Sequence, residues 1–190
     1  MTQQNPTDHK GWYSRNYLPH FDSAETVQHI VFRTFGSLPR DIAGTLPGDA
    51  RAAGMVIEEL LDSGEHGLEL IDNFSRQTVE TALLHGDGEG YRLLAWCVMP
   101  NHVHALIEQM QGHPLARIVR GWKSFTALQI NRARGKTGPF WARDFFDRYM
   151  RNEDQVWRAI GYIEGNPVKA GLVTAAADWP FSSARRERNL

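Results

Sequence analysis

Two histidines stand with one apolar residue between them in the run His102-Val103-His104. Side chains alternate faces along a β-strand, so both imidazoles point to one face and Val103 points to the other, into a core. Two imidazoles one step apart on a strand can bind one metal ion from a rigid platform. A ligand pair does no chemistry alone, so the elements that face it decide the reaction.

A second group of polar side chains lies in a segment expected to be a helix, residues 152–166. An asparagine cap and acidic residues begin this helix, and Pro167 ends it, because proline disfavours helix at the residue before it. Arg158, Tyr162 and Asn166 are spaced four apart and share a face. If that face meets the histidine pair, Asn166 can supply a third ligand and Tyr162 can present its oxygen beside the ion.

A phenol oxygen that has lost its proton is a competent nucleophile toward phosphorus. An adjacent divalent cation can polarise and orient a phosphodiester. Attack by Tyr162 would give a covalent phosphotyrosine that conserves bond energy, with a free 3′-hydroxyl able to reverse the step. The main rival nucleophile is Tyr149, which lacks an amide four residues further on and is expected to be a strand aromatic.

The elements that must position these groups follow from periodicity and turn residues. The expected order is a strand at 29–35, helices at 50–62 and 74–85, strands at 91–98 and 102–108 joined by a turn, a long helix from Pro114, a strand at 140–150 and the helix at 152–166. This order favours an α+β fold of ferredoxin-like (RRM-like) type, an antiparallel sheet with helices on one face. The hairpin would be central, which puts the histidine pair in mid-sheet.

The net charge of −1 is unevenly distributed. Residues 1–114 carry −8, residues 115–151 carry +7 from 9 Lys/Arg and 2 Asp/Glu, and residues 152–190 carry 0. A partner responds to the local field, so the middle block predicts contact with nucleic-acid phosphates. Trp122 and Trp141 lie in it and could stack on unpaired bases, although tryptophan is more often a core residue. The expected DNA contacts are Arg117, Arg120, Lys123, Arg143, Arg148, Arg151, Arg158, Lys169, Arg185 and Arg186.

Composition bounds the setting of the protein. A length of 190 residues suits one domain with appendages, and a single cysteine, Cys97, is typical of a reducing cytoplasm. No stretch approaches a membrane-spanning length, so we expect a cytoplasmic protein without a membrane partner. With a DNA partner it would be nucleoid-associated, and we expect a monomer or a homodimer. The histidines without a partner at ligand spacing are expected to be surface or capping residues: His9, His20, His29, His66, His85 and His113.

Two segments carry a resemblance to a known family. Residues 99–104 (MPNHVH) resemble the histidine–hydrophobic–histidine (HUH) motif of single-tyrosine transposases, and residues 162–173 (YIEGNPVKAGLV) resemble their catalytic-tyrosine segment. The likeness is to the REP-associated tyrosine transposases, within the transposase IS200-like family, and it covers nearly the whole chain. Residues 40–70 match least well, and we assign no function there. Further similar segments are residues 17–21, 36–39, 121–125, 140–141 and 179–180.

The resemblance implies an HUH nicking domain at 29–173, between an N-terminal extension at 1–28 and a basic tail at 174–190. It implies cleavage and rejoining of single-stranded DNA at repetitive extragenic palindromes, which form hairpins, with Mg²⁺ or Mn²⁺ and a 5′-phosphotyrosine intermediate. His102 and His104 would be metal ligands with Asn166, where many relatives have the longer glutamine, and Tyr162 would be the nucleophile. Two alternatives stay open: a DNA-hairpin-binding protein whose chemistry is idle, and a metal-dependent phosphodiesterase that uses water.

Overall fold

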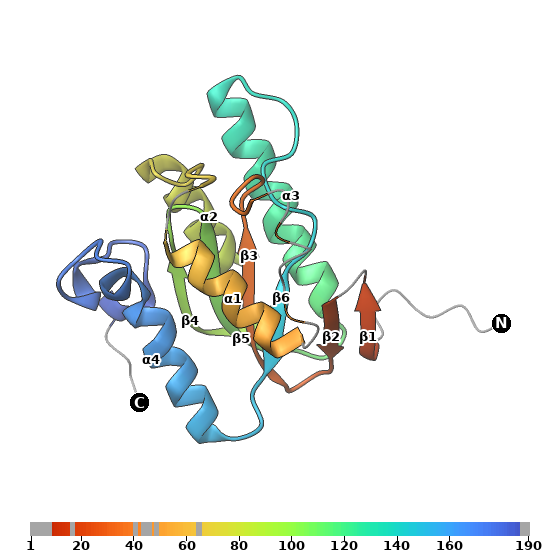
Figure 1. Cartoon of the computed structure of the whole chain (residues 1–190). Helices are drawn as coiled ribbons and strands as arrows, with labels where there is room; N and C mark the ends of the chain where they lie inside the picture. Colours follow the sequence, from red (N-terminus) through yellow and green to blue (C-terminus); the bar gives the residue numbers. More distant parts are fainter. Residues whose placement is uncertain are drawn as a thin grey trace.

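A central sheet with helices around it forms the body of the protein (Figure 1). The computed structural model describes residues 9–15, 18–39, 42, 47, 50–63 and 66–186. None of the helices in these ranges is both long and apolar enough to cross a membrane. In chain order the elements are β1 Gly11–Arg15, β2 Leu18–Asp22, β3 Val27–Arg33, α1 Ala50–Asp62, α2 Asn73–His85, β4 Tyr91–Val98, β5 His102–Gln109, α3 Leu115–Arg134, β6 Phe146–Tyr149, α4 Glu153–Lys169, and the 3-10 helices η2 Ala176–Asp178 and η3 Ser183–Arg185.

The sheet has four antiparallel strands in the order β4-β5-β3-β6. β4 and β5 form the expected hairpin, and β5 is flanked on its other side by β3. In this register His104 lies opposite Val31 and His102 lies opposite Arg33. The histidine pair therefore lies in mid-sheet, as the order of elements predicts.

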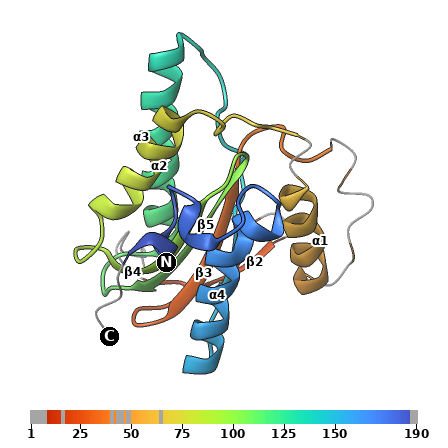
Figure 2. The same ribbon diagram turned by 90° about the vertical axis from the view of Figure 1, so that its left-hand side faces the viewer.

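Helices cover both faces of the sheet (Figure 2). α2 and α3 pack on the face that carries Ile30, Phe32 and Val103. α1 and α4 lie over the opposite face, where the core holds Val31 and Leu106 together with residues of these helices. The antiparallel α+β fold is confirmed, with the addition of this second helical layer. The second helical layer is needed because the side chains of β5 are buried on both faces of the sheet, from His102 to Ile107.

The N-terminal strands form a separate two-stranded hairpin, β1-β2. The sequence predicts no structure over residues 1–14; residues 1–8 lie outside the described part, and residues 11–14 belong to β1. The hairpin is held to the main sheet by buried polar contacts: His20 Nδ1 and the Phe21 amide both bond the Asp147 carboxylate. His20 is thus a buried residue and not a surface one.

Several element boundaries differ from the sequence expectation; β3, for example, spans Val27–Arg33 rather than residues 29–35. α4 continues through Pro167 to Lys169, because the Ala170 amide still reaches the Asn166 carbonyl and Pro167 is buried. The last strand is shorter than expected: β6 begins at Phe146, and the segment before it turns into the core. Trp141 from that segment is buried with Trp122, so neither tryptophan is available to stack on bases.

Candidate active site

The two imidazoles of β5 converge on one point. His102 Nε2 and His104 Nε2 lie 2.9 Å apart, and both side chains are fully buried. His102 Nδ1 lies 2.7 Å from Asn101 Oδ1, whose own amide donates to two backbone carbonyls. The amide oxygen can only accept, so His102 carries its proton on Nδ1 and keeps a lone pair on Nε2.

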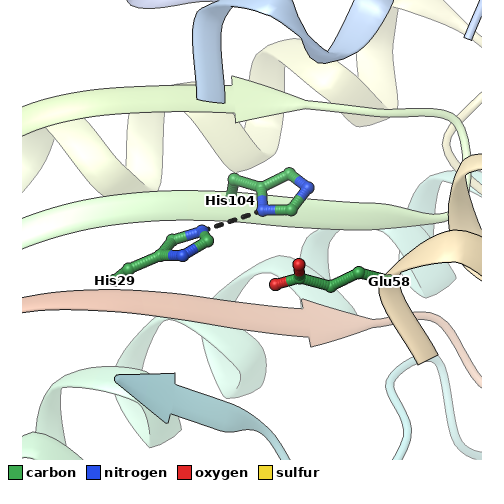
Figure 3. Close-up of side chains that lie close together, drawn as sticks. All are labelled: His29, Glu58 and His104. Atoms are coloured by element: carbon green, nitrogen blue, oxygen red, sulfur yellow. Dashed lines mark hydrogen bonds between the residues drawn. The ribbon is translucent and has the colours of Figure 1, made fainter. Parts of the chain in front are cut away.

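His104 is oriented in the same way by a third histidine. His104 Nδ1 lies 3.0 Å from His29 Nε2, and the two rings are stacked (Figure 3). A proton on His104 Nδ1 satisfies this contact and leaves a second lone pair on His104 Nε2. Two lone pairs 2.9 Å apart repel one another unless a cation lies between them. His29, expected at the surface, is therefore a buried support of the pair.

All three imidazoles are neutral in the folded protein near physiological pH. Burial lowers the pKa of His29 to about 4, with the Arg148 charge adding to the effect. Burial also lowers the pKa of His102 to about 3 and holds the pKa of His104 well below its ordinary value. Neutral imidazole is the form that binds metal ions. The site thus offers two metal-ready nitrogens in a dry environment.

α4 brings Tyr162 to the histidine pair. The Tyr162 ring meets the His104 ring edge-on, with centroids 5.7 Å apart at 89°. Asn166 is buried one turn further on; its Nδ2 donates to the Tyr162 carbonyl, and its Oδ1 accepts no hydrogen bond from any described residue. A buried amide oxygen without a donor is costly in an apolar core. It therefore suits a ligand that supplies positive charge.

Two carboxylates from α1 join the site, and the sequence analysis missed both. Asp62 Oδ1 lies 3.6 Å from His102 Nε2, while Asp62 Oδ2 pairs with Lys169 Nζ at 2.6 Å. Glu58 Oε2 accepts a hydrogen bond from the Tyr162 hydroxyl at 3.0 Å. The signal present in the sequence was their spacing of four on a helix, which puts them on one face.

The donor atoms fit a divalent metal ion. The ligand atoms of Asp62, His102 and His104 lie within 4.8 Å of one another, and so do those of His29, Glu58 and His104 (Figure 3). Asp62 Oδ1, like the Asn166 amide oxygen, is buried without a hydrogen bond among the described residues. Imidazole nitrogens mixed with carboxylate and amide oxygens are ligands for ions such as Mn²⁺, and the oxygens also suit Mg²⁺.

The predicted rival nucleophile lies elsewhere. Tyr149 packs against Phe21 at 4.9 Å and Trp12 at 5.8 Å between ring centroids, beside the N-terminal hairpin. Tyr149 and Arg148 are neighbours in β6, so their side chains point to opposite faces of the sheet. Arg148 lies opposite His29 in the register and shares the face of His29. Arg158 is exposed on α4, where its Nε bonds the Asp154 carbonyl, so the structure does not bring it to the histidines.

The basic block of residues 115–151 is divided by the sheet. Arg117 and Arg120 are exposed on α3, on the side away from the histidine pair. Lys123 Nζ is engaged by the carbonyls of Ala142 and Arg143 at 2.6 and 2.9 Å. The other predicted DNA contacts are exposed: Arg143, Arg148, Arg151, Arg158, Lys169, Arg185 and Arg186. Of these, Lys169 forms an ion pair with Asp62, and Arg186 lies over the Trp96 ring.

Comparison with known proteins gives two sequence relatives. The chain is 28% identical over 107 residues to a Haemophilus influenzae protein assigned as a REP-associated tyrosine transposase, covering 51% of this chain and 61% of the relative. It is 30% identical over 97 residues to the REP-associated tyrosine transposase of Escherichia coli, covering 51% and 56%. The matches thus span less than two thirds of the length of these relatives.

A solved structure shares the fold. The structure of a REP-associated tyrosine transposase bound to a REP hairpin superposes with a TM-score of 0.61 at 20% identity, over 88% of this chain and 81% of that one. The family model described as "Transposase IS200 like" matches residues 75–166, a range that includes His102, His104, Tyr162 and Asn166 and leaves out α1. This range is just under half of the chain, and over it the chain is similar to the transposase IS200-like family.

Proposed function

We propose that the protein cleaves and rejoins single-stranded DNA at hairpin-forming repetitive extragenic palindromes, with Tyr162 as nucleophile and Mg²⁺ or Mn²⁺ as cofactor. The names of the two relatives and the REP hairpin in the neighbouring structure support the choice of DNA substrate. The observation that carries the proposal is the placement of Tyr162, edge-on against His104, one helical turn from the unsatisfied oxygen of Asn166.

The metal ion would be held by His102 Nε2, His104 Nε2 and Asn166 Oδ1, with Asp62 Oδ1 close enough to contribute. Asparagine reaches less far than glutamine, but Asn166 is buried near the end of α4 and its Oδ1 has no hydrogen bond among the described residues. When bound, the ion would polarise the scissile phosphodiester and offset the charge that develops on its oxygens.

The remaining chemistry belongs to the chain. Tyr162 Oη attacks the phosphorus, a P–O bond to the tyrosine forms, and the bond from phosphorus to the 3′-oxygen breaks. The DNA 5′-phosphate is then esterified to Tyr162, and a 3′-hydroxyl attacking the same phosphorus reverses the step.

The DNA would be held through its phosphates by exposed basic residues. Arg148 on β6 shares the face of His29, Arg151 lies over the Tyr149 ring, and Arg158 is exposed on α4. Arg117 and Arg120 offer a second surface on α3. In this proposal residues 29–173 form the catalytic domain, flanked by the extension 1–28 and the tail 174–190. The protein would act on DNA in the cytoplasm, at the nucleoid.

The test uses a single-stranded oligonucleotide that folds into a hairpin with unpaired flanks and carries a 3′-end label. With Mn²⁺, wild-type protein should give a labelled protein–DNA band on a denaturing gel. Tyr162→Phe should bind the hairpin and give no band, and Tyr149→Phe, the matched control, should give one. An adduct with Tyr162→Phe and none with Tyr149→Phe would overturn the assignment. Cleavage without adduct would favour attack by water, and binding alone would favour an idle hairpin binder.

A further inference from the structure

The carboxylate of Glu58 touches the oxygen that the proposed function makes the nucleophile. Tyr162 Oη donates to Glu58 Oε2 at 3.0 Å, from α4 to α1 across the site. Figure 3 shows Glu58 extending from α1 toward the strands that carry His29 and His104. α1 lies outside the residues that the family model matches. One partner of this contact, Glu58, therefore lies outside the matched segment.

Close packing of α1 against the sheet fixes the position of Glu58. Gly54, one turn before it, lies against the Phe146 ring so tightly that an added Cβ would stand 2.6 Å from Phe146 Cε2. Leu61 of α1 is buried in a cluster with Val31 and Leu38. α1 thus lies directly on the sheet, and a carboxylate on its inner face must reach the site rather than solvent.

The electrostatic environment makes proton transfer from Tyr162 difficult without a partner. Burial, reinforced by the charges of Glu58 and Asp62, raises the pKa of Tyr162 well above its ordinary value. Burial also raises the pKa of Glu58, although the hydrogen bond from Tyr162 and the charges of Lys169 and Arg148 oppose this shift. A carboxylate with a raised pKa is a stronger base than an exposed one and better matched to a phenol.

We propose that Glu58 is a catalytic residue, the general base that takes the proton from Tyr162 Oη during attack on DNA; this inference rests on the proposed function. In the step, the Tyr162 O–H bond breaks and its proton passes to Glu58 Oε2, while the oxygen forms the bond to phosphorus. The 3′-oxygen leaves with its electron pair and takes a proton from water. In the reverse step Glu58 returns its proton to the departing Tyr162 oxygen.

A competing role is that Glu58 is a metal ligand with His29 and His104, whose donor atoms lie near its carboxylate. The contact with Tyr162 favours the base, because the phenol that must lose its proton already donates to this carboxylate. The two roles differ in outcome: replacing a base by glutamine leaves the Mn²⁺ affinity unchanged, whereas replacing a ligand carboxylate by the neutral and more weakly binding amide lowers it.

The experiment compares Glu58→Gln, Glu58→Asp and a matched control, Glu59→Gln, which removes an exposed carboxylate from the same helix. Single-turnover adduct formation on hairpin DNA is measured with Mn²⁺-loaded protein, and Mn²⁺ affinity is measured separately by calorimetry. Each variant is also made with a fluorinated tyrosine at position 162, whose more acidic phenol needs less help from a base. A thermal melt of each variant verifies folding.

Glu58→Gln should slow adduct formation by about 10²- to 10⁴-fold, the usual contribution of general base catalysis, with Mn²⁺ affinity unchanged. Glu58→Asp should retain part of the rate, Glu59→Gln all of it, and fluorotyrosine should restore much of the Glu58→Gln loss. A wild-type rate in Glu58→Gln, a loss of Mn²⁺ affinity, or a defect that fluorotyrosine does not relieve would overturn the inference. Absence of any Tyr162 adduct in wild-type protein would instead overturn the proposed function.

Discussion

His102 Nε2 and His104 Nε2 lie 2.9 Å apart, with the other nitrogen of each ring bonded to Asn101 or His29. This spacing is about that of two nitrogens on one metal ion, given metal–nitrogen bonds of roughly 2.1 Å. The side chains that hold the rings are as much a part of the site as the ligands. They fix which nitrogen carries the proton before any ion arrives.

The first prediction concerns these ligands. His102→Ala or His104→Ala should reduce Mn²⁺-dependent cleavage by more than about 100-fold, since even residues behind metal ligands are worth about 10- to 100-fold. Mn²⁺ should support activity at least as well as Mg²⁺, which prefers oxygen ligands and its own waters. Cleavage and calorimetric Mn²⁺ binding are measured together. Full activity of wild-type protein in excess chelator would remove the metal from the mechanism.

The second prediction concerns the pH dependence of metal-free protein. The unfolded chain protonates His29 near its ordinary pKa of 6.5, whereas the folded protein does so only at about 4. Between these values the unfolded state binds more protons, so the free energy of unfolding decreases as pH falls, by about 1.4 kcal/mol per pH unit for each buried histidine. Above pH 6.5 this contribution is fully present.

Urea unfolding between pH 7.5 and pH 4 with chelator present measures this slope. His29→Gln should flatten it by about one histidine's share. His85→Gln is the matched control for loss of an imidazole, because His85 is exposed at the end of α2. Equal slopes for His29→Gln and wild-type protein would show that His29 is not held neutral by burial.

The third prediction concerns the packing of α1 on the sheet. Gly54→Ala places a methyl group 2.6 Å from the Phe146 ring, and such overpacking typically costs about 1–3 kcal/mol. At an open helical site the same change stabilises by about 1 kcal/mol, because alanine favours helix more than glycine does. Gly121→Ala on α3 meets no atom within 4 Å and is the control. Opposite signs of the two changes in unfolding free energy are expected, and destabilisation of Gly121→Ala alone would contradict the packing described.

The contrast between α1 and β5 shows what local sequence can predict. On β5 the alternation of faces alone pairs His102 with His104, and on α4 the spacing of four alone groups Tyr162 with Asn166. The inner face of α1 is set by contact between Gly54 and Phe146, which are far apart in the chain. Glu58 and Asp62 were therefore visible as a helical pair but could not be placed at the site.

The buried positions of His29 and His20 could not be predicted either, because they also depend on residues far apart in the chain. His29 has no ligand neighbour in the sequence, and only the pairing of β3 with β5 brings it to His104. His20 is buried by Asp147, which comes from the last strand of the sheet. The second helical layer could not be predicted without knowing that both faces of β5 are covered. Long-range pairing, rather than local propensity, decided each of these points.

The last prediction separates the two basic surfaces. A residue that contacts a single-strand phosphate contributes about 0.7 to the slope of log affinity against log salt. Arg148 lies on the face of His29, close enough for its charge to lower the pKa of His29, whereas Arg117 lies on α3 behind the sheet. If the strand enters along β6 and α4, Arg148→Ala should reduce the slope by about one contact, and Arg117→Ala should leave it unchanged.

Hairpin binding measured by fluorescence anisotropy across a range of salt concentrations gives the slopes. Lys123→Ala is the control, because its ammonium is already engaged by two carbonyls and its loss should act on stability rather than on salt dependence. Removing a phosphate contact weakens binding to all sequences alike, so hairpin preference should persist in Arg148→Ala. The reverse pattern, with Arg117→Ala reducing the slope and Arg148→Ala not, would place the DNA on α3. The DNA strand to be cleaved would then have to pass around the edge of the β-sheet to reach Tyr162.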